Sequence, residues 1–280
     1  MRKTFLFTVL LFTTATSTIL AQGAFRLPPA SPKQVIQQGF MTGHIAISYS
    51  RPSLNGRKAF GHVIPYGQVW RTGSDSVTRI YFSVPVEING KKLDSGTYAL
   101  YTIPGQDLWE VILNKGINNW GTIGYKESDD VLRFRVEPTK LKKPVETLTI
   151  TIGDITKESC GIDIAWEKRQ IRIPVTGNAK DLIKGKLEAA LNESKPPYWD
   201  GARYYAEYEQ NYPKAIELAS KALEARPKAY WMSLFKAEMQ QKAGDVAGAK
   251  TSAETALAHA KEANNSSYVE MAEAMLKKLK

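Results

Sequence analysis

Residues 49–78 bring together cationic and aromatic side chains that could bind an anion or a sugar. A guanidinium group presents a planar fork of donors that matches the oxygens of a carboxylate, sulfate or phosphate, and an aromatic ring presents a flat face for stacking. Turns at the six glycines and prolines of this segment would bring these side chains together. We therefore predict a pocket for a small anionic or carbohydrate ligand. Its predicted ligand-binding residues are Tyr49, Arg51, Arg57, Tyr66, Trp70, Arg71 and Asp75.

The same arginines have a second interpretation. They could donate to loop carbonyls and to internal carboxylates, and so attach the loop to the rest of the fold. The two interpretations differ in whether at least two guanidinium groups converge on a cleft or face the backbone. The sequence leaves both open.

Groups suited to catalysis or metal binding are sparse. Of the three histidines, His259 lies in a helical region, which leaves His44 and His62 as candidate acid and base groups beside a carboxylate such as Asp75. Neither histidine has metal ligands at a short spacing, so we predict no metal site and no cofactor. Glu110 could belong to a carboxylate pair of the kind that glycosidases use. The sequence contains no nucleophile elbow, phosphate loop or zinc helix, so a non-enzymatic role is favoured and catalytic residues are unknown.

The elements that must position these side chains are strands. Hydrophobic residues alternate from Thr42 to Val175, and "TRIYFSVPVEI" at residues 78–88 predicts one half-buried strand, placed near a sheet edge by Pro85. Asn89-Gly90 then predicts a two-residue hairpin turn. Together these patterns indicate an antiparallel β sandwich or barrel at residues 31–175. The other predicted strands lie at residues 44–50, 97–103, 108–114, 131–138, 146–155, 161–168 and 170–175.

Beyond Val175 the alternation ends, and residues 181–280 have helical spacing. "YPKAIELASKALEARP" and "VAGAKTSAETALAHAK" repeat at a spacing of 34, which aligns Ala215 with Ala249 and Leu223 with Leu257. Small residues at such positions let helices approach closely. This all-α region partly resembles tetratricopeptide repeats, whose grooves capture proteins or peptides, so we predict a protein or peptide partner there.

Residues 1–22 predict a signal peptide, because a short basic start precedes an apolar stretch and small residues that end near Ala21. We expect an exported protein, periplasmic or secreted, with no transmembrane segment in the mature chain. Cys160 has no second cysteine with which to form a disulfide. The formal charge is +10, or +8 without Arg2 and Lys3, and after export it favours acidic glycans, lipids or peptides rather than nucleic acid.

Four segments together resemble one bacterial family: "YSRPSLNGRKAFGHVIPYGQVWRTGSDSVTRIYFS", "INGKKLDSGTYALYTIPGQDLWEVILN", "WGTIGY" and "DVLRFRVEP". The family is the one known as domain of unknown function 2911, and the resemblance covers residues 31–175. Members usually have an alanine and an asparagine after Trp-Arg-Thr-Gly, where this chain has Ser74 and Asp75. The resemblance implies an exported β-rich domain, often followed by helical repeats, and supplies no activity, substrate or cofactor.

Three functional hypotheses follow. The first is an exported binding or scaffold protein, with an arginine and aromatic pocket in the β domain and a docking surface on the helices. The second is a hydrolase or lyase that acts on a cell-envelope polymer. The third is a purely structural envelope module.

Overall fold

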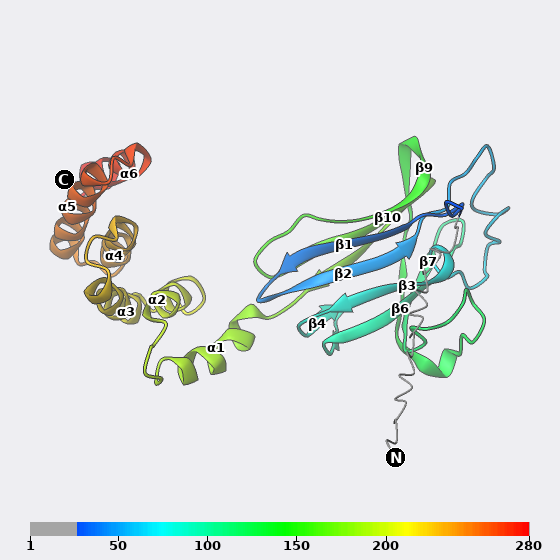
Figure 1. Ribbon diagram of the computed structural model, residues 1–280, viewed down its shortest axis with the longest axis horizontal. Helices are drawn as coiled ribbons and strands as arrows, with labels where there is room; N and C mark the ends of the chain where they lie inside the picture. The colour runs from blue at the N-terminus through cyan, green and yellow to red at the C-terminus, as the bar shows by residue number, and fades with distance from the viewer. Residues whose placement is uncertain (1–26, 280) are drawn as a thin grey trace, which may run out of the picture.

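The computed structural model describes residues 27–279, so the predicted signal peptide lies outside the described residues. Within this range two antiparallel sheets are followed by six α-helices (Figure 1). The first sheet has the order β1-β2-β3-β6-β7-β8, with β1 (Lys33–Phe40), β2 (Gly43–Ser50), β3 (Ser74–Phe82), β6 (Gly96–Ile103), β7 (Trp109–Asn114) and β8 (Asp130–Val136). The second has the order β5-β4-β10-β9, with β5 (Lys91–Leu93), β4 (Val86–Ile88), β10 (Ser159–Thr176) and β9 (Thr139–Gly153). Because neither described sheet closes on itself, the fold is the predicted sandwich and not a barrel.

Alternate side chains of both sheets form one core between them. Ile45 and Ile47 of β2 and Ile162 and Ile164 of β10 are at most 2% exposed. Successive side chains of a strand point to opposite faces. The opposite face of β2 is only partly buried, whereas that of β6 and β7 carries a second apolar cluster that includes Tyr101 and Ile112. Burial of each such side chain stabilises the fold by about 1.5–3 kcal/mol.

Residues 78–88 form two strands in different sheets, and the prediction of one strand is wrong. β3 ends at Phe82 in the first sheet, and β4 begins at Val86 in the second. Pro85 lies between them, and because proline has no N–H to donate, it interrupts the ladder where the chain changes sheet. The alternation nevertheless continues, because both sheets face the same core, which contains Phe82 and Val86.

Three other features complete the comparison of strands. The Asn89-Gly90 turn is confirmed, since both residues have positive φ and β4 pairs with β5 across them. The predicted strands at 161–168 and 170–175 are one strand, β10, whose register shifts around Glu167. β1, an edge strand, was not predicted, because its exposed Val35 is adjacent to the partly buried Ile36 and the two break the alternation.

From α3 onward, each helix packs on the one before it. The helices are α1 (Ala179–Ala190), α2 (Tyr198–Glu207), α3 (Tyr212–Ala225), α4 (Tyr230–Lys242), α5 (Val246–Glu262) and α6 (Ser266–Lys278). Ala215 of α3 and Ala249 of α5 are fully buried at equivalent positions, as the repeat predicts. The helical region is therefore confirmed, and its assignment to the tetratricopeptide class stays a prediction. No helix in residues 27–279 is both long and apolar enough to cross a membrane.

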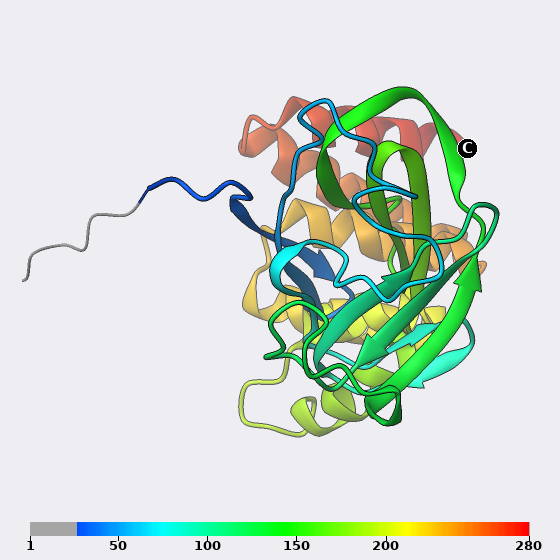
Figure 2. The ribbon, with the colours of Figure 1, turned by 90° about the vertical axis from the view of Figure 1, so that its right-hand side faces the viewer.

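The two regions touch through the hairpin between β9 and β10. The carboxylate of Glu158 accepts a hydrogen bond of 2.8 Å from the backbone N–H of Ala179, at the positive N-terminal end of α1. Lys157 forms an ion pair with Glu207 of α2, and its ammonium lies 5.6 Å from the ring centre of Tyr208. The loop between β2 and β3 lies at the opposite end of the sandwich, away from the helices (Figures 1 and 2).

Candidate functional site

The chain crosses from the first sheet to the second as it leaves β2. Residues 52–54 run beside β9, where Leu148 N donates to Pro52 O and Leu54 N donates to Glu146 O, both at 2.9 Å. Ser53 and Thr147 form an isolated bridge between these two hydrogen bonds. This crossing fixes the start of the loop that carries the predicted site residues.

Tyr49 and Arg51 hold this crossing in place. The Tyr49 hydroxyl is buried, donates to Gln34 Oε1 at 2.6 Å and accepts from Ile150 N at 2.8 Å, and burial raises the pKa of this tyrosine. Arg51 donates from Nε to Leu148 O at 2.9 Å and from Nη2 to the hydroxyl of Thr149. Both side chains therefore connect the two sheets.

Trp70 and Trp166 form an aromatic floor behind the loop. Their rings stack at 5.8 Å between centres with an angle of 19°, and Phe60 meets both edge-on. Trp70 Nε1 donates to Gly73 O, and Trp166 Nε1 donates to Glu146 O. Since both indoles are at least 95% buried and hydrogen-bonded, the floor is rigid.

Arg57 is held in a fixed position on this loop. It donates from Nε to Leu54 O and from Nη2 to Ser53 O, both at 2.9 Å. The side chain is nevertheless exposed, and a guanidinium group has five N–H donors. The carbonyls therefore orient the group and leave further donors for a ligand.

Arg71 is half-buried and makes no side-chain hydrogen bond or ion pair within residues 27–279. Its guanidinium group lies against the backbone of Gly121, where an added Cβ would come within 2.3 Å of Nη1. Gly121 also has a φ of +66°, which glycine adopts readily. Glycine at this position therefore creates the space that Arg71 occupies.

Arg57 and Arg71 line one pocket of about 320 Å³, here called the arginine pocket. Trp70 and Trp166 contribute to its wall, and its lining contains no carboxylate among the described residues. Pockets of similar volume beside β4 and beside β2 are lined by carboxylates, including Glu87 and Glu207. A pocket of about 290 Å³ between β1 and β9 also has no carboxylate in its described lining, but it contains only one arginine, Arg51. Two guanidinium groups without a carboxylate therefore distinguish the arginine pocket from these pockets. Its small polar lining residues, which the sequence did not indicate, are Ser31, Ser53, Asn55 and Ser74.

The other predicted site residues lie outside this lining. Tyr66 is 38% exposed and packs over Gly61. Asp75, also outside the lining, has a φ of +56°, and its carbonyl accepts from Gly121 N at 3.0 Å. The structure therefore brings together Arg57, Trp70 and Arg71 of the seven predicted ligand-binding residues.

The two candidate acid and base histidines are far apart in the fold. His62 is exposed in the loop, whereas His44 lies near the start of β2, 5.4 Å from the ring of Tyr81. Ser50, at the other end of β2, pairs with the pocket residue Ser74, and six residues of strand span about 20 Å. His44 is thus remote from Asp75 and from the arginine pocket.

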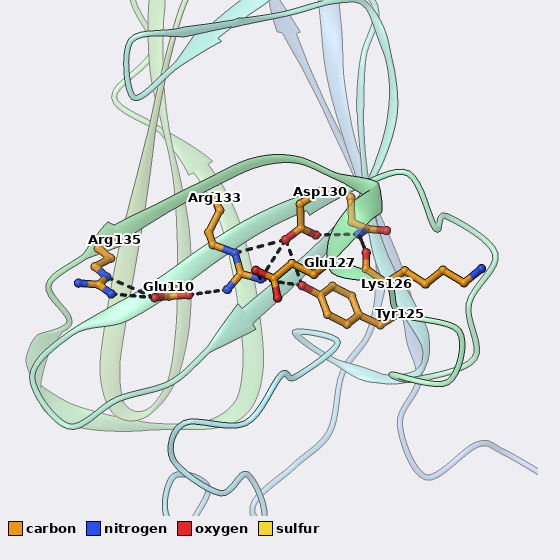
Figure 3. A network of polar contacts seen from close by, with 8 residues as sticks. Glu110, Tyr125, Lys126, Glu127, Asp130, Arg133 and Arg135 are labelled. Atoms are coloured by element: carbon orange, nitrogen blue, oxygen red, sulfur yellow. Dashed lines mark hydrogen bonds and ion pairs between the residues drawn. The ribbon is translucent and has the colours of Figure 1, made fainter.

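A second polar cluster, of which the sequence indicated only Glu110, lies on the outer face of β7 and β8 (Figure 3). Arg133 forms ion pairs with Glu110 at 2.7 Å and with Asp130 at 2.9 Å, and Arg135 lies 3.2 Å from Glu110. Burial, aided by Asp130, raises the pKa of Tyr125 to about 12. Hydrogen bonding from Arg133 lowers the pKa of Glu110, whereas the acid of a glycosidase needs a raised pKa. This cluster therefore acts as an ionic connection between strands, and its charges could be inferred from the alternation of adjacent strands.

The fold and site define a class of protein: an antiparallel β sandwich with a cationic pocket, followed by packed helices. Comparison with protein families identifies the family of the β domain. The sequence model of the family described as "Protein of unknown function (DUF2911)" matches residues 31–175. Because the match covers just over half of the chain, the protein belongs to this family. A comparison with curated proteins finds no match. Every pocket residue named above lies within the matched range.

Proposed function

We propose that this protein is an exported binding protein whose β domain holds a small anionic ligand in the arginine pocket. One observation carries the proposal: two guanidinium groups line a pocket of about 320 Å³ to which the described part of the chain contributes no carboxylate. Ion pairs neutralise the arginines of the β7–β8 cluster, but within residues 27–279 no ion pair neutralises Arg57 or Arg71. A carboxylate, sulfate or phosphate supplies the missing charge.

The geometry supports ligand binding in a second way. The carbonyls of Leu54 and Ser53 fix Arg57, and the backbone of Gly121 supports Arg71. Ordered donors lose little conformational entropy when a ligand binds, so their hydrogen bonds contribute more to affinity. The positive overall charge of the chain also attracts anionic ligands over longer distances.

The helical region is proposed to bind a protein or peptide, and the segment at residues 1–22 to direct export. The support is the repeated packing of α3 and α5, whose buried alanines are 34 residues apart, and the signal-peptide pattern. The structural-module alternative is supported by Tyr49 and Arg51, whose polar groups connect the sheets.

The test is a thermal-shift measurement on the full chain with phosphate, sulfate and galacturonate. A ligand at 100 times its dissociation constant stabilises the folded state by about 2.7 kcal/mol. We expect Arg71→Ala to abolish this shift and to leave the transition of the unliganded protein within a few degrees, because Arg71 has no protein hydrogen-bond partner among the described residues.

Lys58→Ala is the matched control, since it removes one positive charge from the same loop outside the pocket lining. If both variants lower binding equally, the effect is one of net charge and the pocket is not the site. If Arg71→Ala does not fold, Arg71→Lys retains the charge without the fork, and it should bind more weakly than the unmodified protein.

A further inference from the structure

Trp120 differs from the other tryptophans of the protein in its exposure. Its side chain is 61% exposed, whereas the other five tryptophans are buried or half-buried. It lies in the loop between β7 and β8, which also carries Ile123 with 75% exposure. An exposed indole on an ordered backbone presents a flat apolar face and one N–H donor to a ligand.

Backbone contacts hold Trp120 beside the arginine pocket. Trp120 forms an isolated antiparallel bridge with Ser76, and on either side Asn119 O accepts from Val77 N and Asp75 O accepts from Gly121 N. The loop therefore runs along the start of β3, next to the pocket residue Ser74. The register of these hydrogen bonds fixes the position of Trp120.

Arg71 connects the pocket with Trp120. Its side chain lines the pocket, and its Nη1 lies against Gly121, the residue that follows Trp120. A ligand that extends out of the pocket along Arg71 therefore comes to the stretch of loop that carries the exposed indole of Trp120.

From this arrangement we infer that the ligand is an acidic oligosaccharide, with a charged sugar in the arginine pocket and the next sugar stacked on Trp120. The inference rests on the proposed function, in which the pocket binds an anion. It adds a second subsite and a ligand class, namely sugar rings that carry carboxylate or sulfate groups.

The pocket lining favours a sugar over other anions. The hydroxyls of Ser31, Ser53 and Ser74 and the amide of Asn55 can both donate and accept hydrogen bonds. Sugar hydroxyls have the same dual capacity, whereas a carboxylate or a sulfate ion only accepts. Arg71 supplies charge-assisted hydrogen bonds to the acidic group, and Trp120 supplies the stacking surface.

The test is a length series measured by isothermal titration calorimetry on the full chain, with galacturonic acid and its oligomers of two to four sugars. We expect the oligomers to bind about tenfold more tightly than the monomer, and we expect Trp120→Ala to remove this gain while leaving monomer affinity within about twofold. Arg71→Ala should weaken binding of every member of the series. Ile123→Ala is the matched control, because it removes an exposed apolar side chain from the same loop, and it should leave the series unchanged.

The outcomes separate this inference from the proposed function. If phosphate and the monomer bind through Arg71 but the oligomers gain nothing, or Trp120→Ala has no effect, the second subsite is wrong and the anion pocket stands. If none of these anions binds, both fail. Equal binding of neutral maltotetraose overturns the acidic class, and Trp120-dependent binding of ATP without binding of sugars overturns the sugar class. A sulfated tetrasaccharide from chondroitin sulfate, compared with tetragalacturonate, distinguishes sulfate from carboxylate as the recognised group.

Discussion

Tyr49 and Arg71 both belong to the segment of cationic and aromatic residues at 49–78, but their side chains have different surroundings. The hydroxyl of Tyr49 bonds Gln34 and the backbone of Ile150, so its partners belong to the fold. Arg71 lines the pocket and has no side-chain hydrogen bond among the described residues. The difference arises because residues 52–54 cross between the sheets. Tyr49, before the crossing, bonds the other sheet, whereas Arg71, after it, lines the pocket.

Tyr49→Phe should therefore destabilise the β domain without weakening anion binding. The substitution leaves the N–H of Ile150 without its hydroxyl acceptor, and an unsatisfied buried group costs about 1–3 kcal/mol. Urea unfolding followed by tryptophan fluorescence measures the loss. Tyr66→Phe serves as control, because Tyr66 is 38% exposed, and its effect should stay within about 0.5 kcal/mol. Weaker ligand binding in Tyr49→Phe at unchanged stability would contradict this assignment.

Glu110 gives the β domain a predictable dependence on pH. The hydrogen bond from Arg133 holds the pKa of Glu110 below its ordinary value of 4.5. Because the folded pKa is lower than the unfolded one, the stabilisation is complete above about pH 4.5 and is lost as pH falls through the folded pKa. Glu110→Gln should thus lower the free energy of unfolding by about 1 kcal/mol at pH 7, and the difference should shrink at pH 3.

Urea unfolding at the two pH values measures this difference. Glu224→Gln removes an exposed carboxylate from α3 and should show no comparable change between pH 7 and pH 3. A difference for Glu110→Gln that is equal at both pH values would show that the ion pair with Arg133 contributes nothing to the pH dependence.

At the scale of elements, alternation predicts strands but not the sheet to which each belongs. Residues 44–50 and 97–103 are strands as predicted. The first buries alternate side chains on one core, whereas the second is buried on both faces, with Leu100 in the core between the sheets and Tyr101 in a second apolar cluster. The alternation of hydrophobic residues wrongly predicts β3 and β4 as one strand, because the two strands lie in different sheets that face the same core. Prediction of the site from sequence is limited in the same way, because the pattern identifies residues but not the sheet or cleft that they face. Arginines and tryptophans identify the loop, but whether a guanidinium group meets a carbonyl or a cleft depends on the crossing at residues 52–54.

Capping residues determine where the repeated helices begin. The side chains of Asn211 and Asp245 accept hydrogen bonds of 3.1 and 2.9 Å from N–H groups three residues later, at the starts of α3 and α5. Asn211→Ala should destabilise the helical region by about 1 kcal/mol, whereas Asn211→Asp should retain most of the stability. Thermal unfolding followed by circular dichroism at 222 nm measures both variants. Equal losses in the two would show that the cap is not the cause.

At the scale of the whole molecule, the loop between β2 and β3, which supplies most of the pocket lining, and the helices lie at opposite ends of the sandwich (Figure 1). The contacts between the regions are few and polar, with Lys157 paired to Glu207 and Glu158 bonded to the start of α1. Exposed ion pairs contribute at most about 1 kcal/mol, so they couple the two regions weakly. The pocket lining comes entirely from residues 30–166, and no helix contributes to it.

We therefore expect differential scanning calorimetry of the full chain to show two transitions, of which a bound anion raises only one. A ligand stabilises the unit that binds it, and a weakly coupled neighbour unfolds independently of the ligand. Asn211→Ala should lower only the other transition, which identifies it as that of the helices. With Arg71→Ala, the anion should move neither transition. If the anion raises both transitions together, or a single transition includes the whole chain, the helices are coupled to the pocket and can transmit its occupancy to a partner.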